Sequence, residues 1–298
     1  MNRREWLRLA GLGACTLVSS TFPIGRAAAR SGKKPHVLFF TKSSGFEHSV
    51  VRRVGGKLSH AERVLTELGE KHGFEVTATK DGTIFDSDLS RFDVVFFYTT
   101  GDLTRPGTDR QPPMSPKGKE NLLKAIADGL GFMGSHCASD TFHSRGPRNQ
   151  NQPVDRRDPY IRMLGGEFIV HGRQQRARMI VADPHFPGAE RLGKSFELHE
   201  EWYALKNFAD DLHVILVQDT KGMVGRMYNR PPYPATWARL HGKGRVFYTS
   251  MGHREDVWTN PLFQGLIVGA VSWAAGLVEA DVTPNIRKVT PHADRLGA

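Results

Sequence analysis

The sequence predicts an α/β protein built on a doubly wound, mostly parallel sheet, with an antiparallel hairpin at the C-terminal edge of that sheet. In the first half of the chain, short apolar runs alternate with segments whose apolar residues recur at helical spacing. The run FDVVFFYT at 92–99 is apolar nearly throughout, as a parallel strand covered on both faces should be. Near the C-terminus, two apolar runs flank the turn HGKG, which indicates the hairpin.

The first half of the chain divides into strands and helices in alternation. The run HVLFFTK at 36–42 follows Pro35 and ends at a Ser-Ser-Gly segment, which favours a buried strand. Ser59 and Glu62 have the spacing of a capping box, and apolar residues follow at helical spacing. Pro116 opens a second helix, because proline is favoured at the first helical position. The other strands of this half are expected over 74–79, 92–99 and 131–135.

The second half repeats the pattern less regularly. An apolar helix is predicted over 263–275, and Gly276 ends it. Residues after Val278 show little pattern, and we expect them to lie on the surface. Strands are predicted over 179–181, 213–217, 235–240 and 245–250, of which the last two form the hairpin.

Residues 1–29 are predicted to be an export signal rather than part of the fold. Arg3 and Arg4 precede a modest apolar stretch, and three alanines at 27–29 form a cleavage site of the A-x-A type. The apolar stretch is too short for a stable membrane span. We therefore expect twin-arginine export and a periplasmic or secreted protein. In the alternative, LGAC is a lipoprotein box that leaves a lipid anchor at Cys15.

The rest of the chain is expected to form one domain over 30–280 with a tail at 281–298, because no linker or repeat interrupts it. Removing residues 1–29 takes away four arginines and one glutamate, so the formal net charge falls from +10 to +7. The basic residues are scattered and no nucleic-acid motif is present, so we expect no nucleic-acid partner. Only Cys137 remains after cleavage, which excludes an intrachain disulfide.

Polar residues follow several predicted strands at their carboxyl ends, where ligands collect in parallel sheets. These residues are His48 after the first strand, Thr100 and Gly101 after the third, His136 and Asp140 after the fourth, and His253 after the strand at 245–250. Because these strand ends meet at one edge of the sheet, the histidines are expected to converge.

The stretch GSHCASDTFH at 134–143 has the composition of a nucleophile elbow. Such a turn needs small residues two positions before and two after its apex. Gly134 and Ala138 meet this requirement when His136 is at the apex, whereas an apex at Cys137 would have serines there. The layout resembles the class I glutamine amidotransferases, which carry Gly-x-Cys at the elbow and His-x-Glu after a late strand. Because Cys137 is displaced by one residue, thiol catalysis is not favoured.

Several motifs together resemble the trehalose-utilisation (ThuA-like) family, a divergent branch of the amidotransferase-like fold. They are VLFFTKSSGFEHS, GSHCASDTF, GGEFIVHG, HEEWYAL and YPATWARLHGKGRVFYTSMGHREDVWTNPLFQ followed by VSWAAG, and they cover about 35–276. The pair Glu200-Glu201 departs from the commoner Asp-Glu, and the stretches 143–158 and 221–233 look like lineage-specific loops.

The resemblance implies catabolism of disaccharides or their keto derivatives, with a small carbohydrate as partner. Residue types agree with general acid–base chemistry on such a substrate. The predicted catalytic residues are His136, Asp140, Glu201 and His253. The predicted substrate-binding residues are Lys42, Gly45, Phe46, His48, Thr100, Gly101, His171, Trp202 and Tyr203. Trp237 is a further aromatic candidate for a sugar face, although core packing is the favoured explanation for any single aromatic residue.

A divalent metal such as zinc is one open cofactor assignment, with His136, His171 and His253 as candidate ligands. Their spacing lacks the H-x₃-H pattern of a site on one helix, so the sequence also permits chemistry without a metal. Two other functions stay open. One is a non-catalytic sugar-binding module, and the other is a Cys137-dependent amidase.

Overall fold

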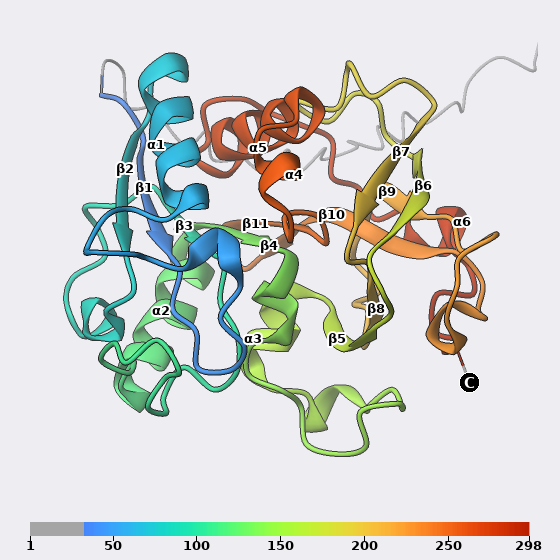
Figure 1. Cartoon of the computed structure of the whole chain (residues 1–298), viewed down its shortest axis with the longest axis horizontal. Coiled ribbons are helices and arrows are strands. Elements are labelled where there is room, and N and C mark those ends of the chain that lie inside the picture. The colour runs from blue at the N-terminus through green and yellow to red at the C-terminus, as the bar shows by residue number, and fades with distance from the viewer. Residues whose placement is uncertain (1–32, 298) are drawn as a thin grey trace, which may run out of the picture.

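A computed structural model describes residues 33–297, and its core is one nine-stranded sheet flanked by helices (Figure 1). The predicted signal at 1–29 and the alternative anchor at Cys15 lie outside the described residues. The strand order is β2-β1-β3-β4-β11-β10-β9-β6-β7. Within residues 33–297, no helix combines the length and apolarity needed to cross a membrane.

The first five strands of this order run parallel, and the other four join antiparallel. The parallel strands are β1 (His36–Phe40), β2 (Glu75–Thr79), β3 (Val94–Phe97), β4 (Gly131–Ser135) and β11 (Gly244–Thr249). The antiparallel strands are β10 (Tyr233–His241), β9 (His213–Gln218), β6 (Gln175–Val181) and β7 (Ser195–Glu200). A separate two-stranded sheet pairs β5 (Glu167–His171) with β8 (Tyr203–Lys206). The prediction of an α/β protein with a parallel central sheet is confirmed.

Helices cover both faces of the parallel strands (Figure 1). On one face lie α1 (His60–His72), α4 (Glu255–Trp258) and α5 (Pro261–Ala274). On the other lie α2 (Pro116–Asp128) and α3 (Pro159–Leu164). Burial on both faces explains why β3 and β4 are buried along their whole length.

Capping residues set the helix boundaries where the sequence predicted them. At α1, the Ser59 side chain accepts from the Glu62 amide and Glu62 accepts from the Ser59 amide, so the capping box is formed. At α2, Ser115 caps the helix and Pro116 is its first residue. Gly73 ends α1 with a left-handed φ of 83°, which costs glycine little.

The position of the hairpin is a correction to the sequence-based prediction. Strands β10 and β11 do pair antiparallel, but they lie in the middle of the sheet and not at its edge. Strands β9, β6 and β7 continue the sheet beyond β10. Strand β7 was not predicted, because SFELHE is largely polar and lacks an apolar run.

The segment after Val278 is packed more closely than expected for a surface tail. A short helix, α6 (Ile286–Val289), lies next to β9 (Figure 1). Ile286 is buried, and the Asn285 side chain accepts from the Val214 amide of β9 and donates to its carbonyl. Helix α6 was not predicted because a segment of this length is too short to show helical periodicity in the sequence.

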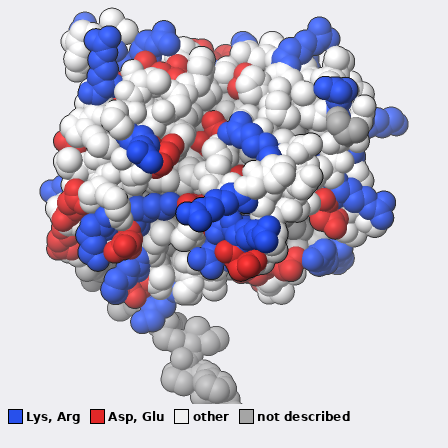
Figure 2. All heavy atoms as spheres, turned by 90° about the horizontal axis from the view of Figure 1, so that it is seen from below, with Lys and Arg blue, Asp and Glu red and all other residues white. Residues whose placement is uncertain are grey.

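Charged side chains of both signs share the surface. On the face seen from below, Lys and Arg lie in several groups, most of them beside Asp or Glu (Figure 2). Exposed pairs such as Lys117 with Glu120 and Lys124 with Asp128 are of this kind. Such pairs contribute little stability each, and the basic excess is distributed rather than built into a recognition motif.

Candidate functional site

The turn after β4 places His136 at the apex predicted from its neighbours. His136 has a φ of +46°, in the left-handed region that side chains rarely adopt. A Cβ atom on Gly134 would lie 2.9 Å from the Ala138 Cβ, so only glycine fits two residues before the apex. His136, and not Cys137, therefore occupies the apex of the elbow.

Hydrogen bonding sets the tautomer of His136. Its Nδ1 lies 3.0 Å from the Ser250 carbonyl oxygen, which can only accept, so Nδ1 carries a proton. In the neutral ring, Nε2 then keeps a lone pair and faces Glu201 Oε2 at 3.5 Å and His253 Nδ1 at 3.2 Å. Burial lowers the pKa of His136 despite the opposing effect of Glu201. His136 is thus held neutral with its free lone pair in the cluster.

Glu201 is the centre of the cluster. Its Oε2 lies 3.1 Å from His253 Nδ1, and its Oε1 lies 3.2 Å from His171 Nδ1. Burial opposes ionisation of this carboxyl group, but contacts with His136 and His253 outweigh burial and hold its pKa well below the usual value. Glu201 is therefore a carboxylate at neutral pH. Its negative charge, with burial opposing, raises the pKa of His253.

His48 joins the cluster from the loop after β1. Its ring lies edge-on to the rings of His136 and His253, with centroid distances of 5.1 Å to each. Its Nδ1 is buried without a hydrogen-bond partner among the described residues. Burial, reinforced by His136 and His253, lowers the pKa of His48 well below its ordinary value. A neutral, buried imidazole with unused hydrogen-bonding capacity is suited to bind a ligand.

The donor atoms of His48, His136, Glu201 and His253 all lie within 4.8 Å of one another. Three imidazoles and one carboxylate are a ligand set that zinc accepts. Metal–ligand bonds of about 2.0–2.1 Å in a tetrahedron require donor atoms roughly 3.3 Å apart. The distances of 3.1, 3.2 and 3.5 Å among Glu201, His136 and His253 fit this spacing.

His171 has a different position from the predicted one. It was expected as a metal ligand, but it is not in the group of four, and His48 takes that place. The Nδ1 of His171 also donates to the Gly172 carbonyl at 2.9 Å, and its side chain is 43% exposed. Because it contacts the other oxygen of Glu201, His171 can orient that carboxylate from the solvent side.

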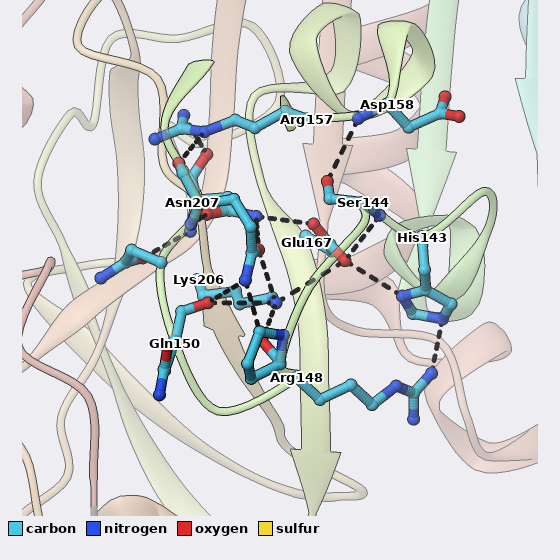
Figure 3. Close-up of polar contacts among 12 residues, drawn as sticks. His143, Ser144, Arg148, Gln150, Arg157, Asp158, Glu167, Lys206 and Asn207 are labelled. Atoms are coloured by element: carbon cyan, nitrogen blue, oxygen red, sulfur yellow. Dashed lines mark hydrogen bonds and ion pairs between the residues drawn. The ribbon is translucent and has the colours of Figure 1, made fainter. Parts of the chain in front are cut away.

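Asp140 is not part of the histidine cluster, contrary to the prediction. Its carboxylate bonds His143 Nε2 at 2.7 Å and Arg148 at 3.1 Å. The other nitrogen of His143 contacts Glu167 at 3.2 Å, as Figure 3 shows. The side chain turns away because the turn spanning 136–140 places Asp140 four residues beyond the apex.

Glu167 anchors this second network, which holds the loop 143–158 in place (Figure 3). It accepts from the Ser144 amide at 3.1 Å and from Asn207 Nδ2 at 2.6 Å. Lys206 Nζ donates to the carbonyls of Pro147 and Gln150 and to Gln152 Oε1. The stretch that looked like a lineage-specific insertion is thus a tightly bonded loop.

Lys42, predicted to bind substrate, is a structural residue instead. It is fully buried, and its Nζ bonds Asp109 at 3.1 Å and the Gln111 carbonyl at 2.7 Å. The polar groups of Gly45, Thr100 and Gly101 also bond within the protein: Thr100 Oγ1 accepts from the Gly45 amide and donates to the Phe46 carbonyl, and the Gly101 amide donates to the Asp140 carbonyl. These three residues shape the loop that carries His48.

The predicted aromatic residues separate into core and site residues. Trp202 and Trp237 are fully buried and donate Nε1–H to the backbone carbonyls of Gln175 and Leu164. Phe46 is 68% exposed beside His48, with ring centroids 5.0 Å apart. The Tyr203 ring lies 4.1 Å from that of His136, and the structure shows no hydrogen bond from its hydroxyl within 33–297. Phe46 is therefore the exposed candidate for substrate contact, whereas Tyr203, which is 3% exposed, packs against the cluster.

The position of Cys137 argues against a thiol nucleophile. The residue is 1% exposed, and burial raises the pKa of its thiol well above the ordinary value. A nucleophilic cysteine needs a lowered pKa and access to substrate. The amidase alternative is not supported.

Sequence reasoning missed Glu200, next to Glu201. Its side chain is fully buried, and burial raises its pKa to about 7. Its position next to Glu201, a predicted catalytic residue, was the sequence signal that could have identified Glu200. The signal is weak because adjacent glutamates are common on protein surfaces.

A surface hollow of ≈ 690 Å³ lies elsewhere, among α3, α6 and the end of β10. Its lining includes Arg157, Arg162, Arg239 and Arg287 but no member of the histidine cluster. The chemistry-bearing residues and this hollow are therefore separate features.

Two solved structures share the fold. A ThuA-like protein from Bacteroides uniformis ATCC 8492 is 20% identical, with a TM-score of 0.60, covering 83% of this chain and 94% of its own. A ThuA-like protein from Parabacteroides merdae ATCC 43184 is 18% identical, with a TM-score of 0.55, covering 89% and 97%. Comparison with curated proteins gave no match.

The family comparison covers every strand of the sheet and the whole histidine cluster. The model of the ThuA family, described as trehalose utilisation, matches residues 36–274. This range begins at β1 and ends with α5, and it includes His48, His136, Glu201 and His253. The chain therefore belongs to the ThuA family.

Proposed function

We propose that this protein acts on a small carbohydrate, a disaccharide or keto-sugar, through acid–base chemistry at the cluster of His48, His136, Glu201 and His253. The observation that carries the proposal is one buried carboxylate, Glu201, within 3.5 Å of ring nitrogens of His136 and His253, with a donor atom of His48 in the same group, in which all donor atoms lie within 4.8 Å of one another. Membership in a family described as trehalose utilisation supports the carbohydrate class.

The residues fit a zinc ion or a similar divalent metal held by the same four side chains. Such an ion, when bound, polarises a carbonyl or lowers the pKa of a bound water. The described chain supports this role through the Ser250 carbonyl, which bonds the far nitrogen of His136 as outer-shell partners of metal-bound histidines do.

In the form of the proposal without a metal, proton transfer belongs to His253 and Glu201, since side chains that bind a metal ion cannot also carry the proton. His253 is part-buried, its pKa is raised, and it contacts the Glu201 carboxylate, so the pair can hold or release a proton close to neutral pH. His136 stays neutral and keeps its proton on Nδ1, directed at Ser250. Phe46, exposed beside His48, can offer an apolar face to a sugar ring.

The strand order supports the finer fold assignment that the motifs suggested. Order 2-1-3-4 followed by parallel β11 matches the 2-1-3-4-5 order of flavodoxin-like sheets. We propose a class I glutamine amidotransferase-like fold in which a histidine occupies the apex of the elbow. In such a fold the histidine at the apex can serve as a metal ligand or proton carrier, and no thiol is required.

The test combines metal analysis with turnover. Protein purified without a histidine tag is assayed for bound metal and then incubated with disaccharides and their keto derivatives, with and without zinc. Glu201→Gln should abolish turnover, and His185→Ala, an exposed turn residue, should not. Saturable sugar binding without turnover in any condition would contradict the proposal of an enzyme and favour a non-catalytic sugar-binding module.

A further inference from the structure

Glu200 bonds the backbone of two segments that carry cluster residues. Its Oε1 accepts from the Glu201 amide at 2.8 Å. Its Oε2 accepts from the amides of Gly252 and His253 at 2.8 and 3.1 Å. The carboxyl group is fully buried and has no ion pair within residues 33–297. All three of its hydrogen bonds within the described chain therefore go to backbone N–H groups, those of Glu201, Gly252 and His253.

The turn that carries His253 is also held by residues from the ends of β3 and β4 and from α4. Ser135 Oγ donates to the Met251 carbonyl, and both Tyr98 and Trp258 donate to the Gly252 carbonyl. Gly252 has a φ of +120°, and a Cβ there would lie 2.6 Å from Ser135 Oγ. The carbonyl groups of Met251 and Gly252 are thus bonded by these residues, and the N–H groups of Gly252 and His253 are bonded by Glu200.

Glu200 bridges a long distance in the sheet. It ends β7 at the sheet edge, and β10, β9 and β6 lie between β7 and β11. In a flat sheet with strands about 4.8 Å apart, β7 and β11 would be roughly 19 Å from each other. The sheet must curl for its antiparallel half to reach the turn after β11. Glu200 bonds directly across the junction that this curl creates.

From these contacts we infer that Glu200 is a positioning residue, which docks the segment carrying Glu201 onto the turn carrying His253. The inference rests on the proposed function only in naming Glu201 and His253 as the reacting pair. The two adjacent glutamates divide the work. Glu201 faces the imidazoles, and Glu200 fixes the distance between Glu201 and His253.

A general packing role would make different predictions. Another buried glutamate, Glu62, is a matched control because it is also fully buried and accepts from three groups: Thr41 Oγ1, Arg53 Nε and the Ser59 amide. These partners lie outside the cluster. Glu62→Gln should therefore lower stability in a comparable way without displacing Glu201 or His253.

The experiment compares Glu200→Gln, Glu200→Asp and Glu62→Gln in the full chain. A glutamine side chain has one acceptor oxygen and one NH₂ group. Its NH₂ group must therefore face a backbone N–H from which the carboxylate accepted a hydrogen bond, and two donors cannot bond each other. In Glu200→Gln, amide hydrogen exchange at Glu201, Gly252 and His253 should accelerate, and the zinc dissociation constant should rise about 10–100-fold. Glu200→Asp keeps both oxygens on a shorter stem and should fall between wild type and Glu200→Gln.

The readouts separate this inference from the proposed function. Amide exchange needs neither zinc nor substrate, so it tests the docking role even where the wild type binds no metal and turns over no sugar. If the folded Glu200→Gln variant exchanges these three amide protons at the wild-type rate, the inference is wrong. An equal loss of protection in Glu62→Gln also overturns it, because the effect would then be one of general stability.

Discussion

At the residue scale, the site depends on which nitrogen of each histidine is committed elsewhere. His136 uses Nδ1 on a backbone carbonyl, His171 does the same with Gly172, and His48 uses neither ring nitrogen in a hydrogen bond within the described chain. These differences divide the histidines into inner and outer positions around Glu201. They also give each one a different expected effect on substitution.

His136→Ala should lower turnover by about 10²–10⁴-fold, the range typical for loss of an acid–base group. It should also release bound metal, because an inner ligand is lost. His171→Ala should leave metal bound, with affinity reduced about 10–100-fold as for outer-shell partners. Kinetics and elemental analysis of both variants check this. Equal metal loss in both would place His171 among the ligands.

Cys137→Ala should keep turnover on the true substrate within a fewfold of wild type. The thiol is buried and has a raised pKa, so it behaves as a small apolar side chain. A stability loss of about 1 kcal/mol is expected from thermal or urea unfolding. Loss of turnover by orders of magnitude in the folded variant would restore the thiol mechanism.

At the element scale, the site is assembled from the ends of strands that are distant in sequence. The end of β4 gives His136, the turn after β11 gives His253, and the segment between β7 and β8 gives Glu201. Each of these ends is fixed by buried hydrogen bonds rather than by the strand alone. The loop 143–158 is fixed in the same way by Glu167, which makes its stability sensitive to pH.

Glu167→Gln should remove a pH-dependent part of the stability. Burial opposes ionisation of Glu167, but His143, Ser144, Lys206 and Asn207 outweigh it and lower its pKa to about 2. A carboxyl group whose pKa is lowered in the folded state stabilises the fold at pH values above its unfolded-state pKa of 4.5. This contribution disappears as the pH falls toward the folded-state pKa of about 2. The wild-type advantage should be on the order of 3 kcal/mol at pH 7.

Urea unfolding from pH 7 to pH 2 measures this difference. The gap between wild type and Glu167→Gln should narrow below pH 4.5. Glu197→Gln removes an exposed carboxylate paired only with Arg176 at 3.5 Å and serves as the control. A gap that is constant over the whole range would mean that ionisation of Glu167 is not what stabilises the loop.

At the scale of the whole molecule, the parallel half of the sheet provides the elbow and the antiparallel half provides the carboxylate. Three of the parallel strands, β1, β4 and β11, lead into His48, His136 and His253, and the antiparallel half returns the chain so that Glu201 reaches them. Targeting of the chain is a separate matter, and its prediction rests on the first 29 residues.

Residues 1–35 fused to a reporter should be exported through the twin-arginine route. The motivating features are Arg3, Arg4 and the alanines at 27–29. Replacing both arginines by lysine should block that export, because the route depends on the arginine pair. Cell fractionation of the two fusions measures it, and equal export of both would remove the assignment.

The sequence by itself determined the parallel half of the fold and the register of the elbow. Apolar runs buried on both faces, capping residues and the small neighbours of His136 are local signals, and local chemistry is what sequence patterns report. The sequence also named His48, His136, Glu201 and His253 individually. It could not show that Lys42 and Trp202 are buried, because both residue types also occur at binding sites.

Only the tertiary structure decided which candidates meet. Asp140 and His136 lie in one turn, yet their side chains join different networks because the turn rotates them apart. Glu201 is 65 residues beyond His136 in sequence, and the fold of the intervening strands brings its carboxylate to within 3.5 Å of the His136 ring. The role of Glu200 depends on three backbone N–H groups, which carry no signature in the sequence. Contacts of this kind are set by the path of the whole chain, so residue patterns alone do not contain them.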